Sequence, residues 1–397
     1  MRVEEPLPRS GGHMRRKNVG TPMRKKLFPI LAIAGLAAAT LTCSPGYLIR
    51  AGIEEGKILS RRRPIERVIQ DPSTSDEVRR KLRLVVDART FAQHALGLDV
   101  GKSYTTFSPV DRDTLLLVVS AARRDRFEQV TWWFPIVGHV PYKGFFDPAD
   151  ALRAAEKLER RGYDTYVRPA GAFSTLGFFD DPLLSTVLRY DDVDLVSTVI
   201  HELTHNTIYV ASHVSFNESF ASFVGDRGAI LFFCTLEGEE GERCRTARNR
   251  WADNLLFGQF LAGLIQELET LYAREDLDPE ARIVAREAVF ERARRRFAEE
   301  LQPQFLDHGF PSFTRTPLNN ATLIARRLYF DRLDLFEAAF ERLGQDLRHV
   351  VHTIIAEAEA ADGDPFGAVT RLAYGDPGPE PVTGGAAVIG GAAPSRD

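Results

Sequence analysis

The chain has 397 residues, with 51 lysines and arginines against 55 aspartates and glutamates, and 44% of its residues are apolar. This length and composition are those of an ordinary globular protein of two or three domains with a large hydrophobic core. The near-neutral charge balance argues against a nucleic-acid-binding protein, and three cysteines are too few for a disulfide scaffold.

The first 42 residues have the pattern of a secretory signal. They carry eight basic and two acidic residues, and an apolar run of 15 residues, Leu27 to Leu41, follows the basic residues 24–26. That run is short for a membrane-spanning helix, which needs about 20 residues, so a signal peptide is favoured over an uncleaved anchor. Without residues 1–42 the chain keeps 43 basic and 53 acidic side chains, a net charge of about −10 instead of −4.

Cys43 lies where bacterial lipoproteins carry their lipidated cysteine. Thr40-Leu41-Thr42 resembles the lipobox only in part, because that motif has Leu three residues before the cysteine and Gly, Ala or Ser directly before it. Ser44, in place of Asp, is typical of lipoproteins sorted to the outer membrane. We therefore expect an exported protein on the periplasmic side of a bacterial membrane, anchored as an outer-membrane lipoprotein through a lipidated Cys43.

Four regions follow the signal. Residues 43–100 interleave charged and apolar side chains at helical spacing, and 101–245 contain short β-branched and aromatic runs before a long apolar helix. Residues 246–374 are almost wholly helical in pattern, and the Gly-, Pro- and Ala-rich segment 375–397 is typical of a disordered tail. We expect strands at Thr114–Val119, Val130–Val140, Asp164–Arg168 and Gly171–Thr175. We expect helices at Pro148–Arg161, Trp251–Ala273, Pro279–Leu301, Asn320–Tyr329 and Asp334–Ala360. The pattern predicts an α+β fold with a small mixed sheet packed on the long apolar helix that begins near Asp191, followed by a mostly helical C-terminal half.

The remaining cysteines, Cys234 and Cys244, bracket the acidic stretch 237–242. In an oxidising periplasm they could form a disulfide that closes this short loop, whereas in the cytosol they would be free thiols. The export signal favours the disulfide.

The helix predicted at Asp191–Asn206 carries the most informative motif, in which His201 and Glu202 are followed by His205. Two histidines four residues apart project from one helix face within about 6 Å of each other, the spacing that lets two imidazoles bind one zinc ion. Glu202 lies about 100° round the helix, where it can take a proton from zinc-bound water. The alternative is a pair of hydrogen-bonded core histidines, which would be costly to bury on an apolar helix without a purpose.

A catalytic zinc ion usually has a third protein ligand and one open position. The metzincin spacing is excluded, because Ala211 stands where a histidine would be needed and Ile208 where a glycine would be needed. We favour Glu218, in the first turn of the next predicted helix, because a short loop lets that helix fold back across the first. The alternative is that Ser215 and Glu218 form only a capping box.

The sequence resembles the bacterial putative aminopeptidase family, hydrolases that are predicted zinc metallopeptidases and often carry lipoprotein signals. The likeness runs from about Cys43 to Leu343. The resemblance implies a zincin-like metalloprotease core of the gluzincin (HExxH) type, with Glu202 as catalytic base and His201, His205 and Glu218 as zinc ligands. The segments that carry it are Phe134-Pro135, Gly138, Tyr142-Lys143-Gly144-Phe145-Phe146, Ser174-Thr175-Leu176-Gly177-Phe178-Phe179-Asp180-Asp181-Pro182-Leu183-Leu184, His201-Glu202-Leu203-Thr204-His205, Phe216-Asn217-Glu218-Ser219-Phe220-Ala221 and Leu318-Asn319-Asn320-Ala321.

One departure leaves the choice between exopeptidase and endopeptidase open. Zinc aminopeptidases of the gluzincin class carry a Gly-x-Met-Glu-Asn strand whose glutamate holds the free amine of the substrate. The nearest segment here, Gly171–Thr175, has no acid. A buried ammonium group must be paired, and Asp180 and Asp181 are the nearest acids. A substrate peptide is expected to add as a strand along residues 171–176.

Other polar residues are candidates for supporting roles. Four side chains are candidates to stabilise the oxyanion of a tetrahedral intermediate: Tyr209, His213, Arg227 and Tyr329. Asn319-Asn320 is best explained as a helix cap. His349 and His352 have spacing compatible with a metal but no evident third ligand.

Two functions follow from these features. The first is a zinc-dependent peptidase in which Glu202 moves the proton of the attacking water, most simply an aminopeptidase. The second is a non-catalytic periplasmic binding or scaffold lipoprotein in which a metal only locks two helices together. Glu202 argues against the second, because a structural zinc site needs a fourth ligand and not a general base.

Overall fold

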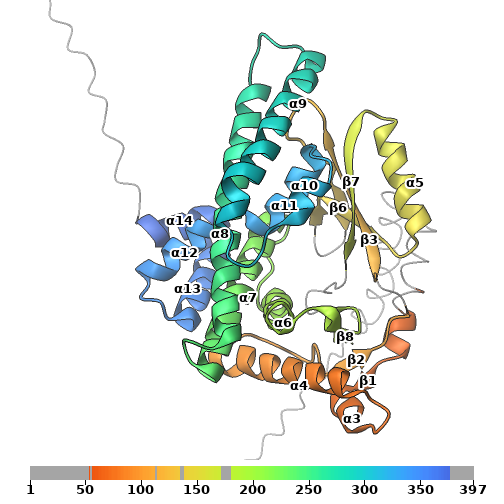
Figure 1. Cartoon of the computed structure of the whole chain (residues 1–397), viewed down its shortest axis with the longest axis vertical. Coiled ribbons are helices and arrows are strands. Elements are labelled where there is room, and N and C mark those ends of the chain that lie inside the picture. The colour runs from red at the N-terminus through yellow and green to blue at the C-terminus, as the bar shows by residue number, and fades with distance from the viewer. Residues whose placement is uncertain (1–52, 54–55, 112–113, 135–137, 171–179, 376–397) are drawn as a thin grey trace, which may run out of the picture. The chain divides into compact units, whose positions relative to one another are not determined.

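The computed structural model describes residues 53, 56–111, 114–134, 138–170 and 180–375 (Figure 1), all within one compact unit, Leu48–Asp397. Over these residues the protein is an α+β fold in which small sheets accompany a helical majority. The signal 1–42, Cys43, the strand expected at Gly171–Thr175 and the tail after Gly375 lie outside the described residues. The expectations for these four segments therefore stay predictions.

The main sheet is antiparallel, with the strand order β6-β3-β7. Its strands are β3 (Leu116–Arg123), β6 (Tyr142–Phe145) and β7 (Tyr163–Ala170). Alternate residues of a strand point to opposite faces. One face, with Val119 and Val167, packs on α5 (Pro148–Glu159), and the other packs on α11 (Asn320–Phe330), as Figure 1 shows.

Two smaller sheets are also present among the described residues. One has the order β1-β2-β8 and is mixed, because β2 pairs antiparallel with β1 and parallel with β8. The other is the antiparallel pair β4-β5, so the region expected as one strand run at Val130–Val140 contains two strands. The bounds are β1 (Arg63–Pro64), β2 (Thr106–Ser108), β4 (Trp132–Phe134), β5 (Gly138–Val140) and β8 (Leu183–Leu184).

Two long helices form the centre of the molecule. They are α6 (Asp192–Thr207), whose first turn is capped by Asp191, and α7 (Val214–Glu237). The sequence predicted a sheet packed on the motif helix, but α6 packs mainly against α4 (Asp76–Phe91) and α7, and the main sheet packs against α5 and α11. The reason is that α6 is apolar on more than one side, and its buried side chains, such as Val196, Val199 and Ile200, belong to the core formed with other helices.

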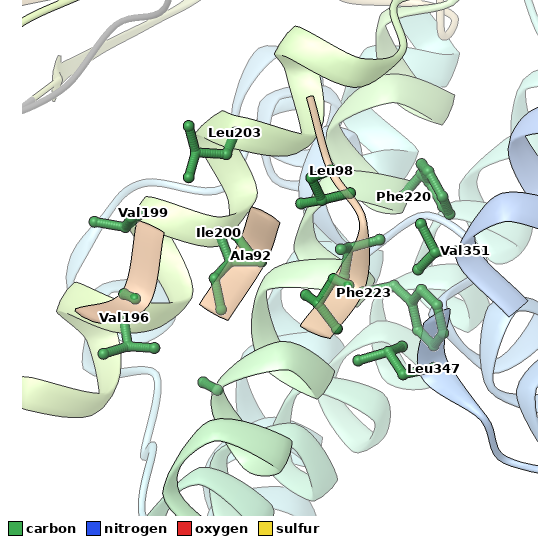
Figure 2. Packing of buried hydrophobic residues seen from close by; sticks show 14 of the residues in the cluster. Ala92, Leu98, Val196, Val199, Ile200, Leu203, Phe220, Phe223, Leu347 and Val351 are labelled. Carbon is green, nitrogen blue, oxygen red and sulfur yellow. The ribbon is translucent and has the colours of Figure 1, made fainter. Parts of the chain in front are cut away.

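The main hydrophobic core lies around these two helices. Figure 2 shows its buried side chains, including Val196, Val199, Ile200 and Leu203 of α6, Phe220 and Phe223 of α7, Ala92, Leu98, Leu347 and Val351. Burial of one such side chain contributes about 1.5–3 kcal/mol to folding. Helix α7 is long and apolar enough to cross a membrane by length and composition, but 56% of its most apolar window is buried in the protein. Its apolar character is therefore explained by its place in the hydrophobic core.

The C-terminal half is helical, as expected, with differences in the helix bounds. Its helices are α8 (Glu242–Tyr272), α9 (Pro279–Arg296), α10 (Pro311–Arg315), α11, α12 (Leu333–Arg342), α13 (Leu347–Ala360) and α14 (Pro365–Tyr374). The single helix predicted at Asp334–Ala360 is wrong, because Gly344 and Gln345 have φ of 89° and 64°, left-handed values that end α12. Helix α14 was not predicted. The shorter elements are α3 (Ile65–Gln70), η1 (Ala92–Leu96), η2 (Val187–Arg189), η3 (Phe297–Leu301) and η4 (Gln302–Gln304).

A buried ion pair holds α9 and α11 to the sheet. Asp164 of β7 accepts hydrogen bonds from Arg286 Nη1 and Nη2 at 2.6 and 3.0 Å, and from the backbone N–H of Asn320 at 3.0 Å. Arg286 is 2% exposed, so this carboxylate and its guanidinium are largely removed from water. The contact fixes the start of α11 against β7.

The two described cysteines are paired. Cys234, near the end of α7, and Cys244, in the first turn of α8, form a disulfide with a Cα–Cα distance of 4.7 Å. The predicted pairing is thus confirmed.

Candidate metal centre

Helix α6 places the two histidines of the motif side by side. Asp191 accepts hydrogen bonds from the N–H groups of Val193 and Asp194, which caps the helix and fixes its start. The rings of His201 and His205 have their centroids 5.0 Å apart. The predicted arrangement of two imidazoles on one helix face is therefore present.

Helix α7 brings Glu218 to these histidines. Its Oε2 atom lies 3.4 Å from His201 Nε2 and 3.7 Å from His205 Nε2. The helix begins at Val214, so Ser215 lies inside it, and the Ser215 hydroxyl donates to Asp331 Oδ2 at 2.7 Å. The capping-box alternative for Ser215 and Glu218 is therefore wrong, and Glu218 is free to face α6.

Two glycines allow α7 to approach α6 closely. A Cβ atom added to Gly225 would lie 2.7 Å from the Ser197 carbonyl oxygen, and one added to Gly228 would lie 2.9 Å from Ile200 Cδ1. Sequence reasoning missed this role. The available signal was a pair of glycines three residues apart on an apolar helix, a spacing that places both on one face.

The three side chains fit a metal ion of zinc size. Their donor atoms all lie within 4.8 Å of one another. Around a tetrahedral ion with bonds of about 2.1 Å, two ligands are about 3.4 Å apart, which is close to the two measured separations from Glu218. Two imidazoles and one carboxylate form a donor set that suits zinc and leaves one position for water or substrate.

The electrostatics of the three residues are those of a carboxylate shared by two imidazoles. Burial raises the pKa of Glu218, but the neighbouring imidazoles of His201 and His205 outweigh it and hold the pKa well below its ordinary value. Burial lowers the pKa of His201, but the adjacent carboxylate of Glu218 and the charge of Glu202 outweigh it, so the pKa is raised. A cation is thus favoured between these groups, and a bound metal ion would take the place of the protons.

Glu202 lies beside the three residues, and its side chain is half-buried. Burial raises its pKa above the ordinary value, although the charges of His201 and His205 act in the opposite direction. A carboxylate with a raised pKa is a better proton acceptor near neutral pH. The position and the pKa both suit a general base.

A further carboxylate, that of Asp226, acts on His201 through its charge. Asp226 of α7 accepts hydrogen bonds from Ser197 Oγ at 2.6 Å and Asn254 Nδ2 at 2.8 Å, and its negative charge is one of the causes that raise the pKa of His201. Carboxylates near a ligating histidine orient the ring and strengthen it as a ligand. Sequence reasoning missed Asp226, because the contact joins three different helices.

The structure separates the four candidates for oxyanion stabilisation. The Tyr329 ring centroid lies 6.2 Å from that of His201, and the Tyr209 ring centroid lies 6.5 Å from that of His205. Arg227 is instead bound by Glu337, with Nε 2.9 Å from Oε2, and His213 precedes α7 as its cap residue. The two tyrosines are therefore the candidates that lie beside the histidines.

The remaining predicted residues have mainly structural contacts. Asn319 caps α11 by accepting from the N–H of Thr322 at 2.8 Å, so the cap prediction is confirmed. His352 Nε2 lies 3.1 Å from the Leu96 carbonyl oxygen. Among the described residues, no cluster of potential metal ligands includes His349 or His352.

A family model of putative aminopeptidases matches residues 46–362, most of the chain, so this protein belongs to the putative aminopeptidase family. Membership supports a peptidase function in general. Comparisons with curated proteins and with solved structures gave no match.

Proposed function

We propose that the protein is a zinc-dependent peptidase with a zincin-like helix pair, in which His201, His205 and Glu218 hold the metal and Glu202 is the general base. The observation that carries the proposal is the position of Glu218 Oε2, 3.4 and 3.7 Å from the two imidazole Nε2 atoms. Family membership, which supports peptide hydrolysis in general, agrees with it.

The protein's own residues have separate tasks in the reaction. When bound, zinc would polarise the scissile carbonyl and acidify a water molecule. Glu202 accepts the proton of the attacking water and then donates it to the leaving amine. The half-buried position of Glu202 keeps its carboxylate partly screened from bulk water, which raises its basicity.

For an aminopeptidase activity, Asp180 and Asp181 are the candidates to pair with the free amine of the substrate. Asp180 is exposed and lies 3.8 Å from Lys102 Nζ, whereas Asp181 is 5% exposed. An endopeptidase of the same fold is the alternative.

We also propose that the protein is exported and tethered through Cys43 to the outer membrane on its periplasmic side. The apolar run before Cys43 supports export. The Cys234–Cys244 disulfide is consistent with an oxidising compartment.

The decisive experiment replaces Glu202 by Gln. E202Q should keep zinc and lose about 10²–10⁴-fold in kcat, because the general base is removed while the three ligands remain. E299Q, at an exposed glutamate of η3, is the matched control and should behave as the wild type. Unchanged peptide hydrolysis by E202Q would refute the mechanism.

Metal removal separates this proposal from the scaffold alternative. If zinc serves catalysis, a chelator should abolish hydrolysis while the helical circular dichroism signal stays, because the apolar core of α6 and α7 is independent of the metal. Loss of the fold together with the metal would favour the scaffold.

A peptide library with free and acetylated N-termini distinguishes an aminopeptidase from an endopeptidase, since only the first requires the free amine.

A further inference from the structure

Arg168 is a cation close to the candidate metal centre. It lies on β7, on the same face as Asp164, which contacts α11. Its Nη2 atom donates to Tyr329 Oη at 3.2 Å, and its guanidinium carbon lies 5.5 Å from the centroid of the Tyr329 ring. Among the described residues no carboxylate forms an ion pair with Arg168. Its contact with the phenol of Tyr329 therefore needs an explanation other than charge neutralisation.

Strand β7 and helix α11 run side by side and are joined at two points. At one end Asp164 accepts from the N–H of Asn320 at 3.0 Å, and at the other Arg168 donates to Tyr329. From Asn320 to Tyr329 the helix rises about 13.5 Å over nine residues, and from Asp164 to Arg168 the strand spans about 13 Å over four residues. The distance between the two contacts is therefore about the same along the helix and along the strand. Arg168 thus fixes the end of α11 that carries Tyr329 beside His201.

The Tyr329 phenol is suited to donate a hydrogen bond. The ordinary pKa of a phenol is about 10, so the hydroxyl keeps its proton at neutral pH. Because Arg168 has no acceptor atom, the contact can only be donated from the guanidinium to the phenol oxygen. The hydroxyl proton must therefore be donated in another direction, and the ring lies 6.2 Å from that of His201.

We propose that Arg168 is a positioning residue, which holds the hydroxyl of Tyr329 so that its proton is donated to the oxyanion formed at the scissile carbonyl. This inference rests on the proposed peptidase function. It also selects Tyr329 over Tyr209, because no arginine among the residues that the structure describes donates to Tyr209 or stacks on its ring. A donor that is already oriented stabilises developing charge without reorganisation during the reaction.

The kinetic test is a double-mutant cycle with the full chain loaded with zinc. Y329F should lower kcat about 10²–10³-fold, the usual loss for one oxyanion donor. R168Q should lower kcat about tenfold or more with KM nearly unchanged, and R168K, which keeps the charge and a donor, should restore part of it. The double variant should be no slower than Y329F, because Arg168 acts only through Tyr329.

Two results would overturn the inference. If the losses in R168Q and Y329F multiply, Arg168 does not act through the phenol. If R168Q raises KM and leaves kcat unchanged, the guanidinium binds a carboxylate of the substrate instead. Y166F, on the same face of β7, is the matched control and should have wild-type kinetics, which excludes a general effect of changing this face of the strand.

A second measurement does not depend on activity. With ¹³C-labelled tyrosine at Cζ, the Tyr329 resonance, identified by its loss in Y329F, should shift in R168Q and move back toward its wild-type position in R168K. An unchanged resonance would refute the contact. If the wild type cleaves no peptide, the peptidase proposal fails and the oxyanion role with it. An active wild type with an unchanged resonance refutes the role of Arg168 alone.

Discussion

Replacing Gly225 by Ala should separate Glu218 from the histidines without changing any of the three proposed zinc ligands. Gly225 is seven residues after Glu218, two helical turns along the same face of α7. A Cβ atom there would lie 2.7 Å from the Ser197 carbonyl oxygen and 3.2 Å from His201 Cβ. Neither the backbone carbonyl nor the Cβ can rotate away, so the two helices must separate.

The size of the effect follows from these distances. An ordinary contact of a Cβ begins at 3.4 Å, so the helices must move apart by about 0.7 Å at this point. Such overpacking costs about 1–3 kcal/mol in the free energy of unfolding. A shift of the same size at Glu218 would widen its 3.4 Å separation from His201 beyond the spacing of two zinc ligands. If the wider ligand spacing costs about 1.4 kcal/mol or more in the free energy of zinc binding, zinc affinity falls about tenfold or more, and this is the result we expect.

The assays are chelator competition for zinc affinity and thermal unfolding of the metal-free protein. Gly263 of α8 is the matched control, because a Cβ there meets nothing within 4 Å. G263A should stabilise the protein by about 0.5–1 kcal/mol and leave zinc affinity unchanged. Wild-type zinc affinity together with wild-type stability in G225A would refute the view that close helix packing sets the ligand spacing.

Three further predictions concern buried or paired acids. Burial raises the pKa of Asp192, but hydrogen bonds from Arg80 and Lys81 of α4 outweigh it and bring the pKa to about 2. The ionised Asp192 therefore stabilises the folded protein above pH 3.8, and this stabilisation is lost as the pH falls toward 2. D192N should therefore be up to about 2 kcal/mol less stable than the wild type at pH 7 but equal to it near pH 2, as measured by urea unfolding. D164A should lower the free energy of unfolding by about 3–5 kcal/mol, because it leaves the charge of Arg286 buried without its partner. Adding R286M to D164A should recover part of this loss. A double variant that is as unstable as D164A alone would contradict the ion-pair explanation. D226N should lower zinc affinity about 10–100-fold by weakening the support of His201, and unchanged chelator competition would show that Asp226 has no such role.

Several features of this protein were evident from local patterns. Helical spacing and caps predicted α5, α6, α9 and α11 with small errors, because periodicity and capping act over a few residues. The pairing of His201 with His205 was predictable for the same reason, since helix geometry brings positions four residues apart together in any tertiary context. The disulfide was predicted from its short loop and the export signal.

Two predictions were wrong, one for a local reason and one for a tertiary reason. The break between α12 and α13 depends on left-handed backbone at Gly344 and Gln345, and the apolar pattern on both sides concealed it. The packing of α6 against α4 and α7, in place of the main sheet, depends on which apolar faces meet, and many pairings satisfy one hydrophobic pattern.

By itself the sequence determined that two histidines share a helix face, because that spacing is a property of the helix. Tertiary structure decided which other side chains lie beside the two histidines. Glu218 reaches the histidines because Gly225 and Gly228 let α7 lie close to α6. Arg168 meets Tyr329 across 161 positions of the chain. Such contacts are set by how helices and strands pack, and packing depends on the shapes of distant side chains that no local pattern records.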